Sequence, residues 1–428
     1  MKKLDYYNNL KKKLKKKSAV ICIIGLGYVG LELLKNFEKK KFNIIGIDLD
    51  KKKLKKLKKL KKVTKTKLSS NYQDINLADI IILALPTPLT KSLTPDLSYI
   101  KASLNSIKGH LKKGQLISLE STTYPGTTEE IIGTFLKKEN FKISEDFFLV
   151  YSPERISPEL KVKDKKIKYN LKNTPKVYSG YSKNCQDLGK MLYKNIVNRV
   201  VPASSLKVAE TTKMIENIFR SINIALVNEL KMFLNKVDID IDETLDLANT
   251  KPFGFTKFSP GPGYGGHCIP LDPFYLYWLA KKNNFDLKFI KTSGMINRKI
   301  SGWISKKIIN FIEKNKIKLY QNKILILGVA YKKNIDDTRE SPAFEIIKKL
   351  KKKKLDFEFS DPYINKINLD GTIKRSKKIT KSLLKKYKVV LIITDHSKFK
   401  YDLISKEAKF IFDSRNVIKN RTKNYFKV

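Results

Sequence analysis

One cysteine of this chain lies in a loop rich in glycine and proline, as a reactive thiol often does. Cys268 stands within residues 261–273, and the carboxylate of Asp272 follows four residues later. Glycines let the backbone approach a bound ligand closely, and a thiolate can attack a carbonyl carbon to give a covalent intermediate. The alternative is a turn around a buried, inert cysteine. A cofactor site elsewhere in the chain would favour the nucleophile.

Such a site is indicated far upstream by a dinucleotide-binding fingerprint. An apolar run over residues 19–24 is typical of a buried parallel strand, and a G-x-G-x-x-G motif follows at 25–30. A predicted helix over 31–40 leads to a second strand over 42–47 that ends in Asp48. In this context the pyrophosphate meets the helix N-terminus and the carboxylate binds the ribose, so NAD is favoured over NADP. The alternative is a glycine turn that binds nothing. A nucleophilic cysteine beside a nicotinamide indicates oxidation to the level of an acid.

The same region contains further loops that face the predicted cofactor. Three more strands are predicted over 79–85, 115–119 and 147–151. Ligands of an open parallel sheet lie at the carboxyl ends of its strands, which makes Thr122 a candidate hydrogen-bond donor. Glu154 follows the third of these strands and could activate the water that ends a covalent intermediate. The alternative for Glu154 is an ordinary surface glutamate.

A long helix is predicted over residues 204–236, which contain neither glycine nor proline. Glu210, Lys213 and Asn217 fall on one face of it. Such a polar stripe usually faces solvent, but this one lies in the chain between the nucleotide-binding region and the Cys268 loop. A helix of this length would also suit a dimer interface.

Alternation of strands and helices begins again past residue 316. Strands are predicted over 323–328, 357–360, 389–394 and 409–412, and a helix over 342–350. This region has no G-x-G-x-x-G motif, so we expect it to hold a different nucleotide, with Lys332 and Arg415 as partners of its phosphates or base. The alternative for both residues is a solvated surface cation.

Composition limits the class of protein. The 428 residues suggest two or three domains, and the formal net charge is +48. Lysine supplies this charge along every predicted helix; over 51–59, leucines recur at helical spacing and lysines fill the solvated face, so we expect no specific nucleic-acid binding. The three cysteines have the spacing of neither a disulfide framework nor a zinc site, and we expect no metal. No apolar run approaches the roughly 20 residues that span a bilayer, and no signal peptide is evident, so we expect a cytoplasmic protein without membrane insertion.

These motifs together resemble one protein family, the UDP-glucose/GDP-mannose dehydrogenases, which oxidise nucleotide sugars at C6. The resemblance extends from about residue 17 to residue 416, with Glu32 standing where the family usually has proline. The matching stretches are 25–30, 120–127, 152–155, 210–217, the Cys268 loop, 328–333 and 336–342. Residues 249–255 and 266–270 look most like the branch that acts on UDP-N-acetylglucosamine and feeds O-antigen and capsule synthesis. UDP-N-acetylmannosamine and UDP-glucose are the alternatives.

The resemblance implies an α/β fold with two Rossmann-like, doubly wound parallel-sheet domains joined by a helical domain with a long central helix. It divides the chain into an NAD-binding domain over 1–200, a central domain over 201–315 with the cysteine loop, and a UDP-sugar-binding domain over 316–428. A homodimer or higher homo-oligomer is also implied.

The resemblance further implies a four-electron oxidation that uses two NAD in turn. An aldehyde forms at C6, Cys268 adds to it, and a second hydride transfer leaves a thioester that water cleaves. Lys213 would stabilise the oxyanion with Asn217 beside it, and Glu154 would activate the water. Asp272 and Thr122 would hold an ordered water for proton transfer.

Binding residues follow from the same resemblance. NAD would be bound by Gly25, Gly27, Tyr28, Val29, Gly30, Asp48, Lys53, Thr87, Ser121, Thr122 and, from the last domain, Arg339. The UDP-sugar would be bound by Glu154, Arg155, Lys213, Asn217, Phe258, Gly265, Lys332, Arg415 and Lys251, the last from a neighbouring subunit.

Two other classes of protein remain open from the residues alone. One is a polyanion-binding protein that has kept a dehydrogenase fold. The high net positive charge favours this class. The other is a two-electron dehydrogenase of hydroxy acids on the same fold, which would not need Cys268.

Overall fold

The structure is a computed structural model that describes residues 5–59, 66–90, 92–155, 170–266 and 269–428. The chain divides into two compact units. One comprises 1–216 with 278–285, and the other comprises 217–277 with 286–428. Across the described ranges, every helix is too short or too polar to span a membrane.

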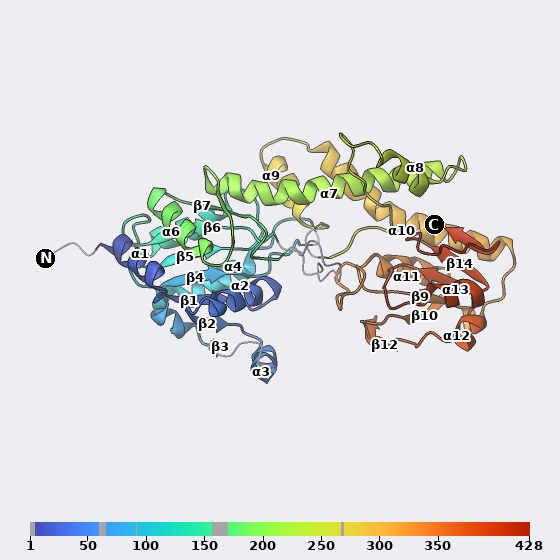
Figure 1. The fold of residues 1–428 in the computed structure, drawn as a ribbon, viewed down its shortest axis with the longest axis horizontal. Coiled ribbons are helices and arrows are strands. Elements are labelled where there is room, and N and C mark those ends of the chain that lie inside the picture. Colours follow the sequence, from blue (N-terminus) through green and yellow to red (C-terminus); the bar gives the residue numbers. More distant parts are fainter. Residues whose placement is uncertain (1–4, 60–65, 91, 156–169, 267–268) are drawn as a thin grey trace. The chain divides into compact units, whose positions relative to one another are not determined.

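The first unit is built on an eight-stranded sheet of order β3-β2-β1-β4-β5-β6-β7-β8 (Figure 1). The strands are β1 (Val20–Ile24), β2 (Asn43–Ile47), β3 (Lys67–Ser69), β4 (Ile80–Leu83), β5 (Leu116–Leu119), β6 (Phe148–Tyr151), β7 (Lys176–Gly180) and β8 (Val200–Pro202). All neighbours pair in parallel except β6 and β7, which are antiparallel. Strands β4, β5 and β6 are buried along their whole length, which accounts for their continuous apolar sequences.

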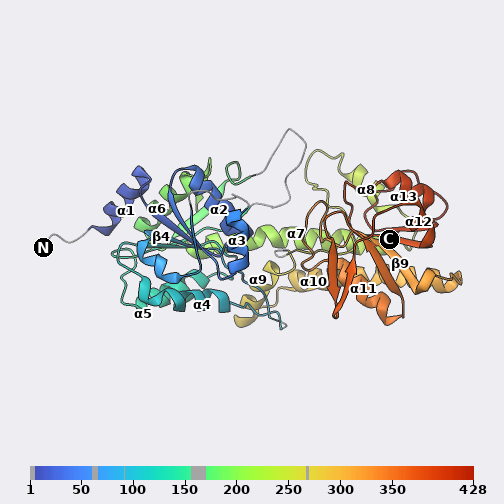
Figure 2. The ribbon, with the colours of Figure 1, turned by 90° about the horizontal axis from the view of Figure 1, so that it is seen from below.

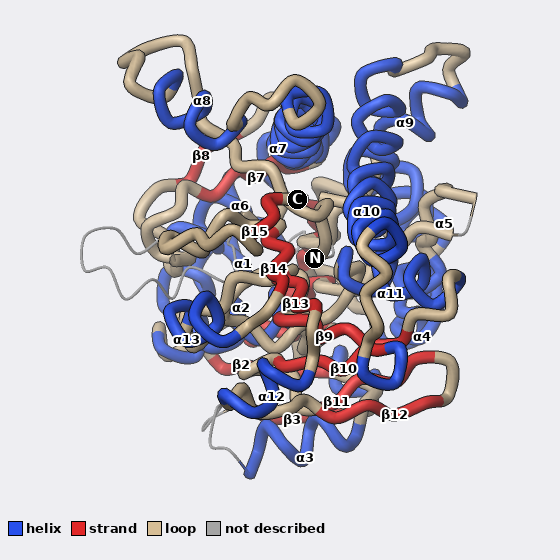
Figure 3. Tube along the Cα trace, turned by 90° about the vertical axis from the view of Figure 1, so that its right-hand side faces the viewer, coloured by secondary structure: helices blue, strands red, loops and turns tan. Residues whose placement is uncertain are grey.

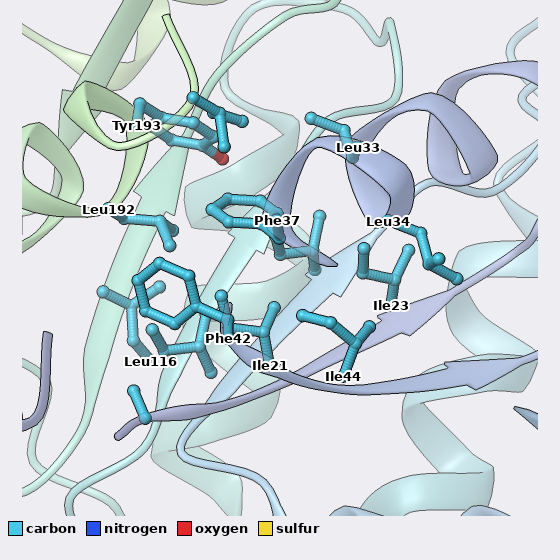
Figure 4. Close-up of a cluster of buried hydrophobic side chains, with 14 of the residues drawn as sticks. Ile21, Ile23, Leu33, Leu34, Phe37, Phe42, Ile44, Leu116, Leu192 and Tyr193 are labelled. Carbon is cyan, nitrogen blue, oxygen red and sulfur yellow. The ribbon is translucent and has the colours of Figure 1, made fainter. Parts of the chain in front are cut away.

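Helices cover this sheet and complete its core. They are α1 (Tyr6–Lys16), α2 (Tyr28–Lys39), α3 (Lys51–Lys59), α4 (Ser98–Ile107), α5 (Thr134–Lys138) and α6 (Lys183–Lys194). Figure 4 shows Phe37 of α2 and Tyr193 of α6 in one buried cluster with Ile21 of β1. Short 3-10 turns lie at Tyr72–Leu77, Lys108–His110 and Tyr320–Asn322, and a π-helical turn at Thr128–Gly133.

Two long helices dominate the middle of the chain, α7 (Leu206–Leu234) and α10 (Lys288–Lys314), and Figure 2 shows both. Helix α7 begins in the first unit and ends in the second. Helices α8 (Ile241–Ala248) and α9 (Asp272–Lys282) lie between them in the chain. The isoleucines of α10 at positions 300, 304, 308 and 312 recur every fourth residue and are buried in one cluster with α11 (Pro342–Lys352).

The second unit contains a parallel five-stranded sheet of order β10-β9-β13-β14-β15 (Figure 3). Its strands are β9 (Lys323–Leu327), β10 (Asp356–Ser360), β13 (Val389–Ile392), β14 (Phe410–Asp413) and β15 (Tyr425–Lys427). Helices α12 (Lys381–Lys386) and α13 (Tyr401–Glu407) accompany it, and β11 (Lys366–Leu369) and β12 (Thr372–Arg375) form a separate antiparallel hairpin.

The predicted fold class is confirmed, with two largely parallel sheets and long helices in the central part of the chain. Every predicted strand is present, with ends within two residues of the prediction. The helix after the glycine motif begins earlier than predicted, at Tyr28, because Gly27 is its N-cap. The helix over 51–59 has its predicted amphipathic form, with Leu54 and Leu57 buried.

Candidate active site

The predicted site residues of the first unit lie along one edge of its sheet. Strands β2, β1, β4, β5 and β6 are parallel neighbours, so their carboxyl ends meet at that edge. The loops that follow these strands carry the glycine motif, Asp48, Thr87, Thr122 and Glu154. The structure therefore brings these candidates to one edge of the sheet, as predicted from the strand order.

The glycine turn between β1 and α2 has the geometry that a dinucleotide needs. Gly25 has a φ of +91°, and a Cβ there would come within 2.4 Å of the carbonyl oxygen of Ala84. A Cβ on Gly30 would come within 1.9 Å of the carbonyl oxygen of Gly25. A Cβ on Gly27, in contrast, would meet no atom within 4 Å. The outer glycines are thus required by the fold, and the middle one leaves open space at a helix N-terminus, where a pyrophosphate fits.

Asp48 braces this turn from the end of β2. Its carboxylate accepts hydrogen bonds from the backbone N–H of Leu26 at 2.9 Å and of Asp50 at 3.0 Å. Lys53 of α3 contacts it with Nζ at 2.6 Å. Burial opposes the charged form, but these contacts outweigh it and lower the pKa of Asp48. A carboxylate charged at neutral pH can accept hydrogen bonds from ribose hydroxyls and repels a 2′-phosphate.

The loops after β4 and β5 are tied to each other. Thr87 Oγ1 donates to the carbonyl of Thr122 at 2.7 Å. The hydroxyl of Ser121 accepts from the N–H of Leu85 at 3.0 Å and donates to its carbonyl at 2.7 Å. Thr87 and Ser121 are buried, whereas Thr122 is partly exposed. Thr87 and Ser121 therefore fix the two loops at the predicted cofactor site, and Thr122 is more exposed than either.

Glu154 and Arg155 follow β6 and are held by short contacts. Glu154 Oε1 accepts from the N–H of Arg155 at 2.7 Å. The guanidinium of Arg155 pairs with Glu216 of α7 at 2.6 Å and donates to the carbonyl of Pro175 at 2.7 Å. Glu154 is 9% exposed. A buried carboxylate held in this way can accept a proton from a nearby water.

The polar stripe of α7 does not face solvent as a whole. Glu210 is fully buried, and it accepts from the N–H of Gly126 at 2.5 Å and from the N–H and Oγ1 of Thr128 at 2.9 and 2.6 Å. Burial raises the pKa of Glu210 to about 7 in spite of these bonds. Lys213 lies one turn further along and is partly exposed. Glu210 thus anchors the helix that carries Lys213.

In the second unit, Asn217 and Asp272 form a buried pair. Asn217 Nδ2 donates to Asp272 Oδ2 at 2.5 Å, and the exposed fractions are 4% and 2%. Asp272 is the first residue of α9, where a helix N-terminus favours a negative charge. Two of the predicted catalytic residues, 55 positions apart in the chain, are therefore in direct contact.

The cysteine loop is only partly described. His267 and Cys268 lie outside the described residues. Just before them, a Cβ on Gly265 would come within 2.6 Å of the carbonyl oxygen of Glu340, so no larger residue fits there. Phe258 packs edge-to-face on Phe219 of α7 with ring centroids 5.7 Å apart. The other cysteines, Cys22 and Cys185, are buried.

Two predicted cations of the second unit gather at the carboxyl edge of its sheet. Arg415 follows β14, and its Nε donates to the carbonyl of Ile393 at 2.9 Å. Its guanidinium lies against Gly261, where a Cβ would come within 2.6 Å of Nη1. Burial lowers the pKa of Lys332, and the charges of Lys333 and Arg415 lower it further. Cations held this close to one another favour an anion such as a diphosphate.

The remaining predicted binding residues are more exposed. Arg339 is exposed and pairs with Asp337, with contacts between 2.6 and 3.1 Å. Lys251 is exposed, and its Nζ lies 4.9 Å from the ring centroid of Phe253. Among the described residues of its own unit, no hydrogen bond or ion pair joins Lys251 to the other predicted binding residues. The role of Lys251 in a neighbouring subunit therefore stays a prediction.

Sequence reasoning missed a buried pair that orders the second unit. Asp361 follows β10, and its Oδ2 accepts from the N–H of Val329 at 2.8 Å and of Ala330 at 3.1 Å. His396 Nε2 lies 3.0 Å from the same oxygen. The signal was available, because an acid that ends the strand beside a glycine turn repeats the arrangement of Asp48.

Sequence reasoning also missed a buried lysine in the first unit. Lys176 of β7 is 3% exposed, and its Nζ lies 2.8 Å from Glu120 Oε2. Burial raises the pKa of Glu120 to about 7 against the charge of Lys176. No local signal could distinguish Lys176 from the many surface lysines of this chain.

Three family models match the chain. They are the NAD binding domain of the UDP-glucose/GDP-mannose dehydrogenase family over residues 19–197, its central domain over 207–299 and its UDP binding domain over 325–420.

Individual relatives cover most of the chain. A UDP-N-acetyl-D-glucosamine 6-dehydrogenase of Pseudomonas aeruginosa is 32% identical, over 82% of this chain and 84% of its own. A UDP-N-acetyl-D-mannosamine dehydrogenase of Pyrococcus horikoshii is 30% identical, over 93% of this chain and 96% of its own. A solved structure of a UDP-D-ManNAc dehydrogenase from Pyrococcus horikoshii superposes with a TM-score of 0.83 at 28% identity, covering 95% of this chain and 97% of that one.

Proposed function

This chain belongs to the UDP-glucose/GDP-mannose dehydrogenase family of NAD-dependent nucleotide-sugar dehydrogenases, and we propose that its substrate is a UDP-N-acetylhexosamine. The observation that carries this proposal is that relatives matching more than four fifths of the chain are named for N-acetylated UDP-sugars. UDP-N-acetylglucosamine is our first candidate, because residues 249–255 and 266–270 resemble that branch. UDP-N-acetylmannosamine is the second, since the relative named for it matches a larger share of the chain.

The proposed reaction converts the C6 alcohol of the sugar to a carboxylate. NAD, when bound, accepts a hydride from C6 in each of two oxidation steps. Between these steps the thiolate of Cys268 adds to the C6 aldehyde. After the second step C6 is a thioester of Cys268, and water releases the acid and regenerates the thiol. The uronic acid would serve the synthesis of a surface polysaccharide such as O-antigen or capsule.

Residues around C6 would share the proton and charge transfers. Lys213 stabilises the negative oxygen that forms when the thiolate adds to the aldehyde and when water adds to the thioester. Asn217 lies one turn along the same helix, and its bond to Asp272 fixes the orientation of that carboxylate. Asp272 and Thr122 hold a water that relays protons, and Glu154 takes the proton of the hydrolytic water.

Nucleotide binding would be divided between the sheets. The glycine turn, Asp48 and Lys53 bind NAD, while Lys332 and Arg415 bind the diphosphate of the UDP-sugar. Our proposed domain boundaries are 1–200 for NAD binding, 201–315 for the central domain and 316–428 for UDP-sugar binding. We also propose a homodimer or higher homo-oligomer in which Lys251 reaches the site of a neighbouring subunit.

The first test is the amount of NADH formed per UDP-N-acetylglucosamine consumed, with NAD in excess. We expect a value near two, as the thioester route requires. A value near one would indicate a two-electron dehydrogenase and remove Cys268 from the mechanism. If the enzyme turns over UDP-N-acetylmannosamine but not UDP-N-acetylglucosamine, the substrate is the other epimer.

A second test replaces the nucleophile. We expect Cys268→Ser to stop acid formation, because serine is a much poorer nucleophile than a thiolate at neutral pH. Binding of NAD and UDP, measured by calorimetry, serves as the control for folding. Normal acid output from this variant would exclude the covalent route.

A further inference from the structure

A buried group of charges lies directly behind Glu154 in the first unit. Lys176 of β7 and Glu120, which follows β5, are 3% and 1% exposed, and Lys176 Nζ lies 2.8 Å from Glu120 Oε2. Tyr193 of α6 donates its hydroxyl to Glu120 Oε1 at 2.5 Å, and its ring centroid lies 4.9 Å from Lys176 Nζ. We call Lys176, Glu120 and Tyr193 the buried triad.

Burying such a charged group in a core costs free energy. Removing two opposite charges from water costs several kcal/mol per ion before pairing, and well-packed apolar residues are often as stabilising. The surrounding core consists of such residues, including Leu116 of β5 and Leu192 of α6. The buried triad therefore calls for a role beyond filling space.

The buried triad is directed at Glu154. Lys176 Nζ lies 3.9 Å from Glu154 Oε2 and 3.4 Å from the carbonyl oxygen of Pro153, the residue just before it. One ammonium group thus faces two carboxylates, those of Glu120 and Glu154. Their mutual repulsion is one of the influences that raise the pKa of Glu120, after burial and against the attraction of Lys176.

Other charged and titratable groups also face Glu154. Arg155 donates its backbone N–H to Glu154, but its guanidinium is paired with Glu216 of α7. Tyr28 of α2 is close enough for the charge of Glu154 to influence it, and burial, followed by Glu32 and Glu154, raises the pKa of Tyr28 to about 12. Lys176 therefore faces Glu154 as well as its nearer partner Glu120, whereas the guanidinium of Arg155 is directed at Glu216.

We infer that Lys176 and Glu120 are positioning residues for the hydrolysis step, and that they hold Glu154 and set the charge it presents to water. This inference rests on the proposed function, in which Glu154 is the base. As the oxygen of water bonds to the thioester carbon, a proton passes to Glu154, the C–S bond breaks and the thiolate of Cys268 leaves. No electron is transferred in this step. Lys176 holds the carboxylate of Glu154 in place, and Glu120 takes up part of the charge of Lys176.

The test uses the complete enzyme with saturating NAD and UDP-sugar. In Lys176→Met we expect hydrolysis to slow by about tenfold or more, a part of the roughly 10²–10⁴-fold that general-base catalysis supplies. Both oxidation steps precede hydrolysis, so a burst of two NADH per subunit should remain. The acyl-enzyme should then accumulate and appear as added mass on the intact protein. Lys176→Arg keeps the charge and should restore turnover.

Two further variants separate charge from structure. Glu120→Gln leaves Lys176 to pair with Glu154 alone, and we expect the acid limb of the kcat profile to move to lower pH by about one unit. Lys176→Met combined with Glu120→Gln removes both charges, leaves Glu154 without this cation and should move that limb to higher pH. Urea midpoints and NAD affinity report on folding.

The outcomes decide between this inference and its alternatives. Opposite shifts of the acid limb with accumulated acyl-enzyme support the inference. If the acid limb moves equally in both variants, or does not move, the inference is overturned. Failure of the double variant to fold also overturns it, because the buried triad would then be structural. A wild-type yield of one NADH per sugar would instead contradict the proposed function, so the two failures are distinguishable.

Discussion

Gly25 and Gly27 lie two positions apart, yet the structure gives them different roles. Gly25 adopts a left-handed φ of +91° and has no room for a Cβ, whereas Gly27 has open space around it. We expect Gly25→Ala to destabilise the first unit by at least about 1 kcal/mol through strain and crowding. Gly27→Ala should fold normally but bind NAD more weakly, because its methyl group takes space meant for the pyrophosphate.

Urea unfolding and calorimetric NAD affinity measure the two effects separately. Gly109 is a matched control, since a Cβ there also meets no atom within 4 Å and it lies outside the predicted site. Gly109→Ala should change neither quantity. Equal loss of NAD affinity in the Gly27 and Gly109 variants would contradict the assigned cofactor site.

His396 is fully buried and makes two bonds that require one tautomer. Its Nδ1 accepts the N–H of Asn334 at 2.9 Å, so the proton must be on Nε2, which faces Asp361 at 3.0 Å. In His396→Asn the side-chain oxygen can still accept the N–H of Asn334. In His396→Gln the side-chain amide can still donate to Asp361. We expect each to cost about 1–3 kcal/mol of unfolding free energy. Only the glutamine variant should raise KM for the UDP-sugar, because it releases the segment that carries Lys332.

Steady-state KM values and urea midpoints for both variants provide the comparison. A rise in KM in the asparagine variant alone would mean that Asp361, and not Asn334, transmits the effect, and a similar rise in both would mean that both bonds do. An unchanged KM in both would exclude His396 from ordering the substrate site.

At the scale of elements, α7 is joined to the first sheet through Glu210 and the loop at 126–128. Burial raises the pKa of Glu210 to about 7, above its value in an unfolded chain. The folded state therefore binds this proton more tightly. The resulting stability is complete below the unfolded pKa and is lost as pH rises through about 7.

Glu210→Gln removes this titration. We expect the unfolding free energy of the wild type, measured relative to the variant, to fall between pH 5 and pH 8 by up to about 1.4 kcal/mol per pH unit. Glu229→Gln, at an exposed position of the same helix, is the control and should leave the slope unchanged. A constant difference between wild type and Glu210→Gln across this range would show that Glu210 does not titrate there.

The strands and helices that the sequence predicted are those with a continuous apolar run, such as β4, or with strong helical periodicity, such as α7. Those it missed are short or depend on distant partners. β3 has only three residues, and β7 pairs antiparallel with β6 although 24 residues separate the two strands. β11 and β12 have only four residues each and contain three apolar residues among their eight, so their alternation is too short to mark them.

The site was predictable where a residue follows a recognisable strand or motif, as Asp48 and Glu154 do. Contacts across long stretches of chain were not, because they depend on tertiary packing. The pairing of Lys176 with Glu120 joins residues 56 positions apart, and in a chain with 89 lysines and arginines nothing local marks that one. The bond between Asn217 and Asp272 was likewise invisible, although both residues were predicted to be catalytic.

At the scale of the whole molecule, the formal charge of +48 should act mainly through solution electrostatics. Helix α3 illustrates the pattern, with Leu54 and Leu57 facing the core and lysines on the exposed face. Helix α3 contains no acidic residue that would balance the charge of its lysines. Both proposed ligands, NAD and a UDP-sugar, are anions and would be concentrated near such a surface.

Added salt should therefore lower the rate of ligand capture more than the rate of the chemical step. The Debye length falls from about 30 Å at 0.01 M salt to about 10 Å at 0.1 M, so attraction by distant lysines is lost over this range. We expect kcat/KM for NAD to fall several-fold while kcat changes little. Replacing the exposed Lys55, Lys56 and Lys58 by glutamate, with Lys53 kept, should lower kcat/KM at low salt and bring it to the wild-type value at high salt. The glutamine triple variant should lie between the two. A salt-dependent fall of kcat itself, or identical behaviour of all three proteins, would show that the lysine-rich surface does not guide these ligands.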